Sequence, residues 1–333
     1  MNLNTLRHCN ITGTGRYVPD KVITNEYLES LVDTNDEWIR QRTGIIERRM
    51  AAPEQATSDL CIEAAKIAIA DAGLTPTDID QIIVATVTPD HVFPATACIV
   101  QHALGCRQVP AYDIAAACSG YIYALSIART AIAAGTAEHV LVIGAETLTR
   151  VTDYTDRGTC ILFGDGAGAT VVSRVDDSED GIIDTHLAAD GVGANLMILP
   201  ASGSRIPASH ESVDQKLHFT RLEGRAVYKN AIAKIVMLVN ESLARCNLTM
   251  DDVSMIIPHQ MNARIIESAA KHLSIPLDKI FINLDQYGNT SGATIPMAID
   301  QAKREEKIKK GDLVCLVAFG GGMTWASALV RWR

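Results

Sequence analysis

The stretch DIAAACSGYIYALSIARTAIAAG, residues 113–135, decides the fold because its pattern recurs once, as LDQYGNTSGATIPMAIDQAKREEKIKKG at residues 284–311. Each stretch places a reactive polar residue, Cys118 or Asn289, just before a Ser-Gly pair that opens a helical pattern. Each helical pattern ends near a glycine, as helix C-terminal caps commonly do. Such a recurrence indicates an architecture that is built from a repeated unit.

The segments that flank the two stretches also match. Upstream, LTPTDIDQIIVATVTPDH (74–91) and LTMDDVSMIIPHQ (248–260) each open with Leu-Thr and an acidic turn, then continue as a strand rich in Ile and Val. Downstream, each stretch is followed by an apolar strand, at 139–146 and at 312–322. Any α/β protein shows loosely similar strand–helix segments, but matched spacing across four elements favours duplication. Residues 185–225 have no counterpart and are predicted to be an insertion or loop region.

These patterns predict an α/β protein whose hydrophobic strands are covered by helices on both faces. We expect two halves, residues 1–178 carrying Cys118 and residues 179–333 carrying Asn289. Packing of the two halves would place these two residues at equivalent ends of equivalent helices, close to a pseudo-twofold axis.

The composition argues against several functional classes. The 333 residues carry a net charge of −9, which does not suit general binding to nucleic acid. Eight cysteines without a CxxC pair or a Cys/His ligand spacing argue against a disulfide framework and against structural zinc. Apolar stretches are broken well before the roughly 18 residues that a membrane span needs, and the N-terminus lacks the regions of a signal peptide. We therefore expect a cytoplasmic protein with no metal site and no membrane partner.

Three residues are candidates for chemistry. Cys118 precedes a helical pattern, and the dipole and unpaired N–H groups of a helix N-terminus favour a thiolate, so we expect a lowered pKa. His259 follows a strand pattern and a proline, at the strand end where α/β folds present catalytic groups. The alternatives are a buried structural cysteine and a satisfied structural histidine. Asn289 suits the N-cap of the following helix equally well.

Several longer motifs carry a resemblance to a known family. AAACSG, PHQMNARI, GNTSGATIP and FGGGMTW occur in order, and DEWIRQRTGI (36–45) and DRGTCILFGDGAGA (156–169) accompany them. The set resembles the ketoacyl-acyl-carrier-protein synthase III family of the thiolase superfamily, from about Ile11 to the C-terminus. The resemblance implies a thiolase-like five-layered fold (αβαβα) from two duplicated halves, and a homodimer. The apolar segment 93–105 is a candidate for the dimer interface.

The resemblance also implies a chemistry. Cys118 would accept an acyl group from acyl-CoA, and His259 and Asn289 would act on malonyl-acyl-carrier-protein. Loss of CO2 from the malonyl thioester leaves an enolate, and two neutral donors aimed at its oxygen provide the stabilisation that this step needs. The backbone N–H groups of Cys118 and Gly321 would form the oxyanion hole. Neither a metal nor a cofactor other than the acyl-CoA substrate is implied.

Further positions match the family's binding residues. Those implied for CoA are Trp38, Arg42, Arg157 and Asn262. Those implied for docking the acidic carrier protein are Arg264, Lys271 and Lys229. Those near the acyl pocket are Phe93, Leu148 and Phe163. A half-buried structural anchor is the alternative for Trp38, and an ion pair with Asp153 or Asp156 is the alternative for Arg157.

The leading interpretation is a decarboxylating Claisen condensation of a primer, most simply acetyl-CoA, with malonyl-acyl-carrier-protein to start fatty-acid synthesis. The main alternative is a related condensing enzyme of secondary metabolism that uses another acyl or aroyl primer. A thiolase fits less well, since thiolases carry a second cysteine near the GGG turn, which here reads GGGMTWAS. A Cys-His hydrolase needs a residue that orients a general base, which Asn289 does not suit. An intact set of Cys118, His259 and Asn289 argues against a non-catalytic acyl-CoA-binding protein.

Overall fold

Two mixed β-sheets organise the computed structural model, which describes residues 6–176 and 181–333. The first sheet has the strand order β1-β7-β6-β4-β5. Its strands are β1 (His8–Tyr17), β4 (Gln81–Ala85), β5 (Ala111–Ile114), β6 (His139–Thr147) and β7 (Asp165–Val175). The second sheet has the order β11-β12-β13-β8. Its strands are β8 (Gly181–Ala189), β11 (Met255–Pro258), β12 (Leu313–Gly320) and β13 (Thr324–Arg331).

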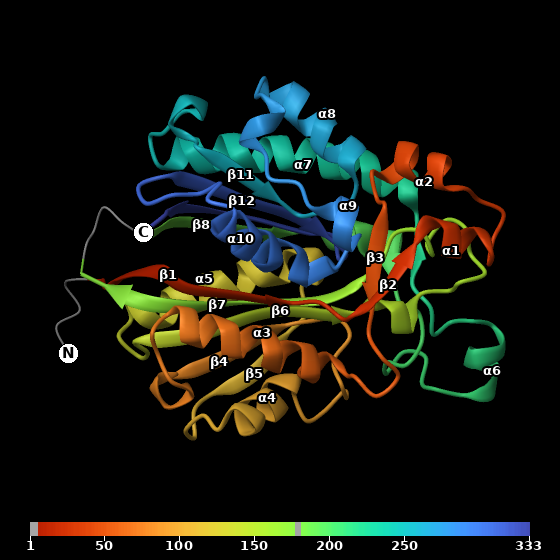
Figure 1. Ribbon diagram of the computed structural model, residues 1–333, viewed down its shortest axis with the longest axis horizontal. Coiled ribbons are helices and arrows are strands. Elements are labelled where there is room, and N and C mark those ends of the chain that lie inside the picture. The colour runs from red at the N-terminus through yellow and green to blue at the C-terminus, as the bar shows by residue number, and fades with distance from the viewer. Residues whose placement is uncertain (1–5, 177–180) are drawn as a thin grey trace.

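Helices form three layers around the two sheets (Figure 1). The outer layers are α3 (Thr57–Asp71) with α4 (Thr96–Leu104) on the first sheet, and α7 (Gly224–Arg245) with α8 (Ala263–Leu273) on the second. The middle layer is α5 (Gly120–Ala133) with α10 (Thr294–Arg304), which lie between the sheets and contact strands of both. This αβαβα sandwich is the five-layered fold predicted from the sequence.

The two sheets repeat one another strand by strand, which confirms the predicted duplication. In both, an antiparallel pair joins an antiparallel neighbour and then a parallel one: β1-β7-β6-β4 in the first sheet and β8-β13-β12-β11 in the second. Beyond β4 the first sheet continues with the parallel strand β5, whereas beyond β11 a single parallel bridge joins Ile256 to Ile280. The predicted boundary between residues 178 and 179 lies outside the described residues, between β7 and β8.

Smaller elements gather at one end of the sandwich, on the right in Figure 1. They are β2 (Lys21–Thr24), α1 (Asn25–Glu29), α2 (Asp36–Thr43), β3 (Glu47–Met50), α6 (His210–Asp214) and α9 (Leu284–Tyr287), with the short pair β9 (Met197–Ile198) and β10 (Arg221–Leu222). The prediction that residues 185–225 form an insertion is wrong at their start, because residues up to Ala189 complete β8 and pair with β13. The alternation that would have indicated this strand is weak, since most of its residues are half-buried.

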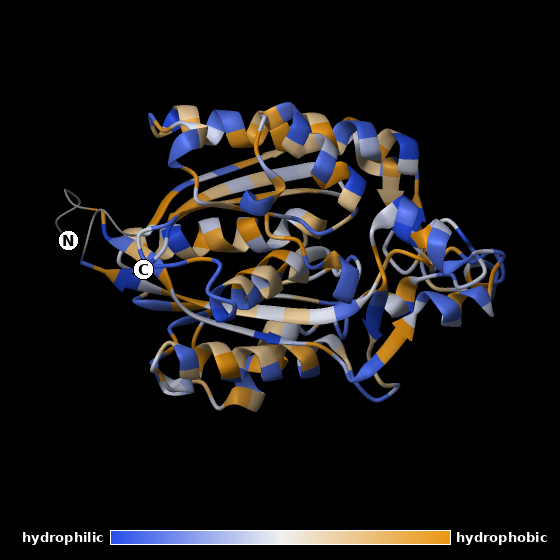
Figure 2. Ribbon diagram, turned by 45° about the horizontal axis from the view of Figure 1, so that its top comes forward, coloured by the Kyte–Doolittle hydropathy of each residue, from blue (hydrophilic) through white to orange (hydrophobic). Residues whose placement is uncertain are grey.

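The helix α10 of the middle layer is almost completely buried. Nine consecutive residues of α10, from Thr294 to Ala302, are buried. Glycines on the facing strands allow this close packing, because a Cβ on Gly144 of β6 would lie 2.2 Å from the Gly292 carbonyl oxygen. Figure 2 shows strands that are mostly white to orange and outer helices that alternate between blue and orange, as one solvated face requires. Among the described residues, none of the helices combines the length and the hydropathy needed to cross a membrane.

Candidate active site

Cys118 lies in a tight turn at the start of the central helix α5. The turn is the 3-10 segment η2 (Ala117–Ser119), and its first residue, Ala117, has a φ of 46°. From the second half, Gly320 at the end of β12 packs against this turn so closely that a Cβ there would lie 2.7 Å from the Cys118 nitrogen. The Thr324 hydroxyl donates to the carbonyl oxygens of Ala116, at 2.9 Å, and of Gly321, at 3.1 Å. These contacts bring the Cys118 and Gly321 backbones together.

Burial raises the pKa of the Cys118 thiol to about 12, so the prediction of a lowered pKa is wrong. A hydrogen bond from the Ser291 side chain lowers the pKa, and the nearby Glu146 carboxylate raises it, but both effects are smaller than burial. Only 4% of the residue is exposed, and loss of hydration disfavours a thiolate more than one helix terminus favours it. In the resting protein Cys118 therefore carries its proton, which must leave during any acylation.

His259 directly follows β11, and its backbone N–H donates to the Val317 carbonyl oxygen at 2.8 Å. The residue is 1% exposed, and burial lowers the pKa of the imidazole to about 3. Nδ1 lies 2.7 Å from the Thr294 hydroxyl oxygen. Nε2 is buried and has no hydrogen-bond partner within the described part of the chain. The ring is therefore neutral, with one nitrogen held and the other free for a ligand.

Asn289 is fixed through its backbone to the loop that precedes β7. Its N–H donates to the Leu162 carbonyl oxygen at 2.9 Å, and its own carbonyl oxygen accepts from Gly164 at 3.1 Å. Its side-chain Oδ1 accepts from the Ser291 N–H at 2.8 Å, so the capping role that the sequence suggested is partly realised. That bond uses the oxygen of the amide and leaves the Nδ2 donor for a substrate.

The two helix-opening turns correspond, although in a different register from the predicted one. The second turn is η7 (Ser291–Ala293) before α10, and Ser291 has a φ of 46°, as Ala117 has before α5. Ser291 is therefore the structural counterpart of Ala117, and Gly292 is the counterpart of Cys118. Cys118 and Asn289 therefore lie at equivalent ends of equivalent helices, as predicted, but Asn289 is three residues before the counterpart of Cys118. Helical patterning locates a helix but not the first residue of its turn.

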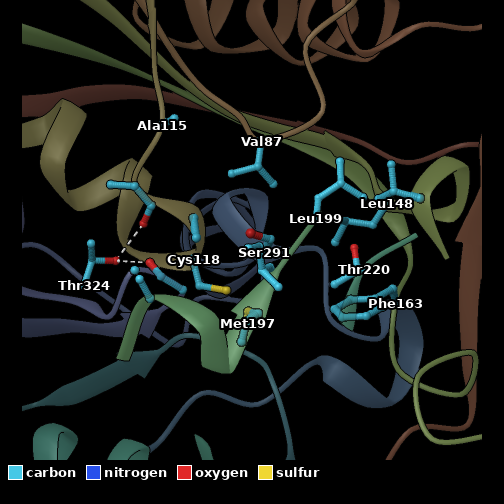
Figure 3. A pocket seen from close by; sticks show the side chains of 17 residues that line it. Val87, Ala115, Cys118, Leu148, Phe163, Met197, Leu199, Thr220, Ser291 and Thr324 are labelled. Atoms are coloured by element: carbon cyan, nitrogen blue, oxygen red, sulfur yellow. Dashed lines mark hydrogen bonds between the residues drawn. The ribbon is translucent and has the colours of Figure 1, made fainter. Parts of the chain in front are cut away.

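An apolar cavity of about 330 Å³ opens beside Cys118 (Figure 3). Leu148 and Phe163 line it, as the sequence predicted for an acyl pocket. The sequence analysis missed other lining residues, among them Val87, Val151, Met197, Leu199, Thr220 and Ser291. Phe93 does not line it: the residue is 84% exposed, so its predicted place in the pocket of its own chain is wrong. Apolar character alone did not distinguish an inward position from an outward one.

His259 and Asn289 are not among the residues that line this cavity, but both contact the turn that contributes Ser291. The Asn289 side chain accepts a hydrogen bond from the Ser291 N–H. Thr294 Oγ1, which contacts His259, lies 2.9 Å from the Ser291 carbonyl oxygen. The Ser291 side chain in turn reaches the Cys118 thiol. The three predicted catalytic residues therefore converge on the segment 289–294.

The residues predicted to bind CoA form one cluster at the end of the sandwich that holds the smaller elements. The Arg157 guanidinium carbon lies 4.2 Å from the centroid of the Trp38 ring, and that of Arg42 lies 5.7 Å away. Arg157 does not pair with Asp153 or Asp156; its nearest carboxylate is that of Asp33, at 3.9 Å. Two positive groups beside the indole ring suit a planar, negatively charged ligand.

Asn262 has a structural role in addition to its predicted one. Its Oδ1 accepts from the Arg264 N–H at 3.0 Å and caps α8, and its Nδ2 donates to the Arg42 carbonyl oxygen at 3.0 Å. It thereby ties α8 to α2. Position 262 before a helical pattern was a capping signal that the sequence analysis did not use.

The residues predicted to dock a carrier protein lie on the outer helices of the second half. Lys229 is on α7, and Arg264 and Lys271 are on α8; all three are exposed. None of them forms an ion pair within residues 6–176 and 181–333. A shallow hollow between the helices is lined by Tyr228, Lys229, Ile232, Ala233, Val236 and His272.

The duplicated five-layered fold, with a buried cysteine at the start of a central helix beside an apolar cavity, defines an acyl-transferring enzyme of the thiolase fold. Comparison with known families specifies it further. The family described as 3-oxoacyl-[acyl-carrier-protein (ACP)] synthase III matches residues 112–191, and its C-terminal counterpart matches residues 243–332. The chain belongs to the 3-oxoacyl-[acyl-carrier-protein] synthase III family.

Individual relatives agree with this assignment. The beta-ketoacyl-[acyl-carrier-protein] synthase III of Caldanaerobacter subterraneus is 55% identical over 97% of both chains. That of Solibacter usitatus is 48% identical over 97% of this chain and 98% of the relative. The crystal structure of 3-oxoacyl-[acyl-carrier-protein] synthase III from Aquifex aeolicus superposes with a TM-score of 0.90 at 45% identity, covering 97% of this chain and 100% of that one.

Proposed function

We propose that the enzyme condenses an acyl-CoA primer with malonyl-acyl-carrier-protein, giving 3-oxoacyl-acyl-carrier-protein, CO2 and CoA, the step that initiates fatty-acid synthesis. The observation that carries this proposal is the placement of Cys118 between an apolar cavity and the Gly321 backbone, in a chain that belongs to the synthase III family. Acetyl-CoA is the simplest primer for that reaction.

In the first half-reaction, Cys118 Sγ attacks the thioester carbonyl carbon of the primer. The S–H bond breaks, an S–C bond forms, and the proton ends on the departing CoA sulfur. The oxyanion that forms in between is stabilised by the backbone N–H groups of Cys118 and Gly321. The apolar chain of the primer lies in the cavity, in contact with Leu148 and Phe163. The product is an acyl-enzyme, as nucleophilic catalysis requires.

In the second half-reaction, the malonyl thioester loses CO2 and leaves an enolate. His259 Nε2 and the Asn289 side-chain amide donate hydrogen bonds to the thioester oxygen while negative charge accumulates on it. The low pKa of His259 supports this role, because the buried ring stays neutral near pH 7 and need not gain or lose a proton in order to donate from Nε2. The enolate carbon then attacks the acyl carbonyl, a carbon–carbon bond forms, and Cys118 Sγ leaves and recovers a proton.

The substrates reach the site from two surfaces. The CoA moiety of the primer binds against Trp38, with Arg42 and Arg157 beside the ring and Asn262 near the pantetheine arm. The acidic carrier protein docks on Arg264, Lys271 and Lys229 of α7 and α8. These three cations have no ion-pair partner in the described part of the chain, which leaves their charge available to a partner.

We also propose that the enzyme is a cytoplasmic homodimer. Two consecutive apolar residues, Val92 and Phe93, are 87% and 84% exposed just before α4. Strand β5 lies at the edge of the first sheet, on the same side. Exposed apolar side chains beside an open sheet edge are suited to self-association. Light scattering coupled to size exclusion should give the mass of a dimer, whereas a monomer at micromolar concentration would contradict the proposal.

The mechanism is tested by mass spectrometry of the intact protein. Brief incubation with acetyl-CoA should add one acetyl group, located on Cys118 by peptide mapping, and malonyl-acyl-carrier-protein should discharge it as acetoacetyl-carrier-protein. A Cys98→Ala variant is the matched control, since Cys98 is an exposed thiol that does not line the cavity. Labelling of Cys98 alone, or no labelling by any acyl-CoA, would contradict the assigned nucleophile.

A further inference from the structure

We propose that the Thr294 hydroxyl is a positioning residue that holds neutral His259 in the tautomer with its proton on Nε2. This inference rests on the proposed function, since it concerns the donor that the decarboxylation step uses. Thr294 is the first residue of α10 and touches neither the cavity nor the thiol. Its proposed action is on His259 alone.

The hydroxyl has two neighbours and one proton. Thr294 Oγ1 lies 2.7 Å from His259 Nδ1 and 2.9 Å from the Ser291 carbonyl oxygen. Both side chains are buried, Thr294 being 3% exposed and His259 1%, so bulk water does not provide a substitute partner. The direction of this single proton therefore determines whether Nδ1 accepts a hydrogen bond or must donate one.

The Ser291 carbonyl oxygen already has a donor. It accepts the backbone N–H of Thr294 in the 3-10 turn that precedes α10. His259 Nδ1 has no other hydrogen-bond partner than Thr294 Oγ1 among residues 6–176 and 181–333. Donation to Nδ1 thus provides a donor for Nδ1 and leaves the Ser291 carbonyl oxygen with the one that it already has. It also places the ring proton on Nε2, the atom that is buried and has no partner among the residues that the structure describes.

The opposite arrangement conflicts with the chemistry of the site. If Nδ1–H donated to the Thr294 oxygen, the neutral ring would turn a lone pair on Nε2 toward the substrate. A lone pair repels the negative charge that develops on an enolate oxygen, whereas an N–H stabilises it. A doubly protonated ring does not resolve the conflict, because burial lowers the imidazole pKa to about 3.

A comparison of the two central helices supports a specific role for this hydroxyl. The residue of α5 that corresponds to Thr294 is Gly120, which has no side chain to donate. The turn itself therefore forms without a hydroxyl at this position. The hydroxyl is present in the half of the molecule that also contributes His259.

The test separates the two half-reactions in Thr294→Val, Thr294→Ser and a matched control, Thr290→Val. Thr290 is a similarly buried threonine beside the same turn, and within the described residues its hydroxyl has one hydrogen-bond partner, the Met297 sulfur at 3.7 Å. Acetylation of Cys118 is measured by intact mass, and decarboxylation by CO2 release from malonyl-acyl-carrier-protein. We expect Thr294→Val to acylate within about twofold of the parent and to decarboxylate about 100-fold more slowly, the size typical of one lost donor. Thr294→Ser should restore decarboxylation, and Thr290→Val should resemble the parent.

A spectroscopic readout makes the proposal falsifiable even if Thr294→Val fails to fold. The ¹⁵N spectrum of the parent enzyme labelled in histidine, assigned with His259→Gln, should show a protonated Nε2. A parent spectrum with the proton on Nδ1, or undiminished decarboxylation by folded Thr294→Val, would overturn the inference. Absence of acylation in the parent enzyme itself would instead contradict the proposed function.

Discussion

The turn that carries Cys118 and the turn that carries Ser291 have the same backbone and different tasks. Both begin with a residue whose φ is 46° and both open a central helix. In the first turn the next residue is the thiol of Cys118; in the second it is Gly292. The second turn instead uses the residues on either side of it, Asn289 before and Thr294 after. One duplicated backbone thus supplies a nucleophile in one half and the support for two donors in the other.

The backbone of the second turn is bound by Glu146, a buried residue at the end of β6. The Glu146 carboxylate is buried and accepts from the Gly292 backbone N–H, and also from Thr88 Oγ1 at 2.6 Å and the Val87 N–H at 3.1 Å. It therefore links the second turn to the loop after β4, whose Val87 lines the cavity. A Cβ on Gly292 would lie 3.3 Å from the Ala85 carbonyl oxygen at the end of β4, which is a tight contact. A nucleophilic side chain at 292 would have little room.

The largest effect is expected at the residue that distinguishes the first turn. Cys118→Ala should reduce condensation by about 10⁴-fold or more, since no other group can carry the acyl chain. Decarboxylation of malonyl-acyl-carrier-protein should persist, because the second turn is unchanged. Steady-state condensation and CO2 release, measured side by side, check this. Equal loss of both activities would show that the two turns do not divide the work.

The second turn gives the opposite pattern. Asn289→Ala should leave acylation of Cys118 within a few fold and lower decarboxylation by about 10²- to 10³-fold, because an N–H donor to the developing enolate is lost. The measurement is single-turnover acylation by intact mass, followed by CO2 release. Ala115→Ser, a change at the corresponding position of the first turn, is the control. Impaired acylation in Asn289→Ala would place Asn289 in the first half-reaction instead.

The carboxyl group of Glu146, which contacts the second turn, should make the free energy of unfolding depend on pH. Burial raises the pKa of its carboxyl group from 4.5 to about 7, so between these values the folded protein keeps a proton that the unfolded chain has released. A rise in pH through this window therefore lowers the free energy of unfolding, by at most about 3 kcal/mol. Glu146→Gln should remove this part of the pH dependence. Urea unfolding of parent and variant at about pH 5, 6 and 7, which lie within this window, measures the effect. Identical dependence of the free energy of unfolding on pH in the two proteins would refute the assignment.

The smallest predicted effect concerns the outer helices of the two halves. Arg264 on α8 has no ion pair in the described chain, whereas Lys66 on α3 pairs with Glu63 at 2.7 Å. Arg264→Glu should raise KM for malonyl-acyl-carrier-protein about tenfold at low salt, and less at high salt. Lys66→Glu reverses the same charge on the other half and should leave KM unchanged. Equal effects of both variants would indicate attraction by overall charge rather than docking on α7 and α8.

Much of the fold was predictable because duplication leaves a strong pattern. Matched Leu-Thr openings, apolar strands and glycine-terminated helices predicted two equivalent halves, and the two sheets confirm them strand by strand. The order of the motifs also predicted the family. Local residue patterns carry this information because hydrophobic periodicity and capping residues act within a few turns of chain.

The site was less predictable wherever distant segments meet. The lowered pKa predicted for Cys118 is wrong because burial by β12 and the second turn outweighs the helix terminus. Phe93 is equally apolar in sequence to Phe163, yet the first is exposed and the second lines the cavity. Ser291, Thr294 and Glu146 were not singled out, since a serine, a threonine before a helix and an acidic residue at a strand end are ordinary signals in isolation.

The residue patterns by themselves therefore determined the α/β class, the duplication and the residues able to do chemistry, and the family resemblance of the motifs implied the five-layered fold. Only the tertiary structure decided which residue of each turn faces the site, that Cys118 rests as a thiol, and that Thr294 lies against His259 Nδ1. The physical reason is that periodicity is a property of short segments. Burial, and with it pKa and hydrogen-bond direction, depends on which surfaces the two halves press together.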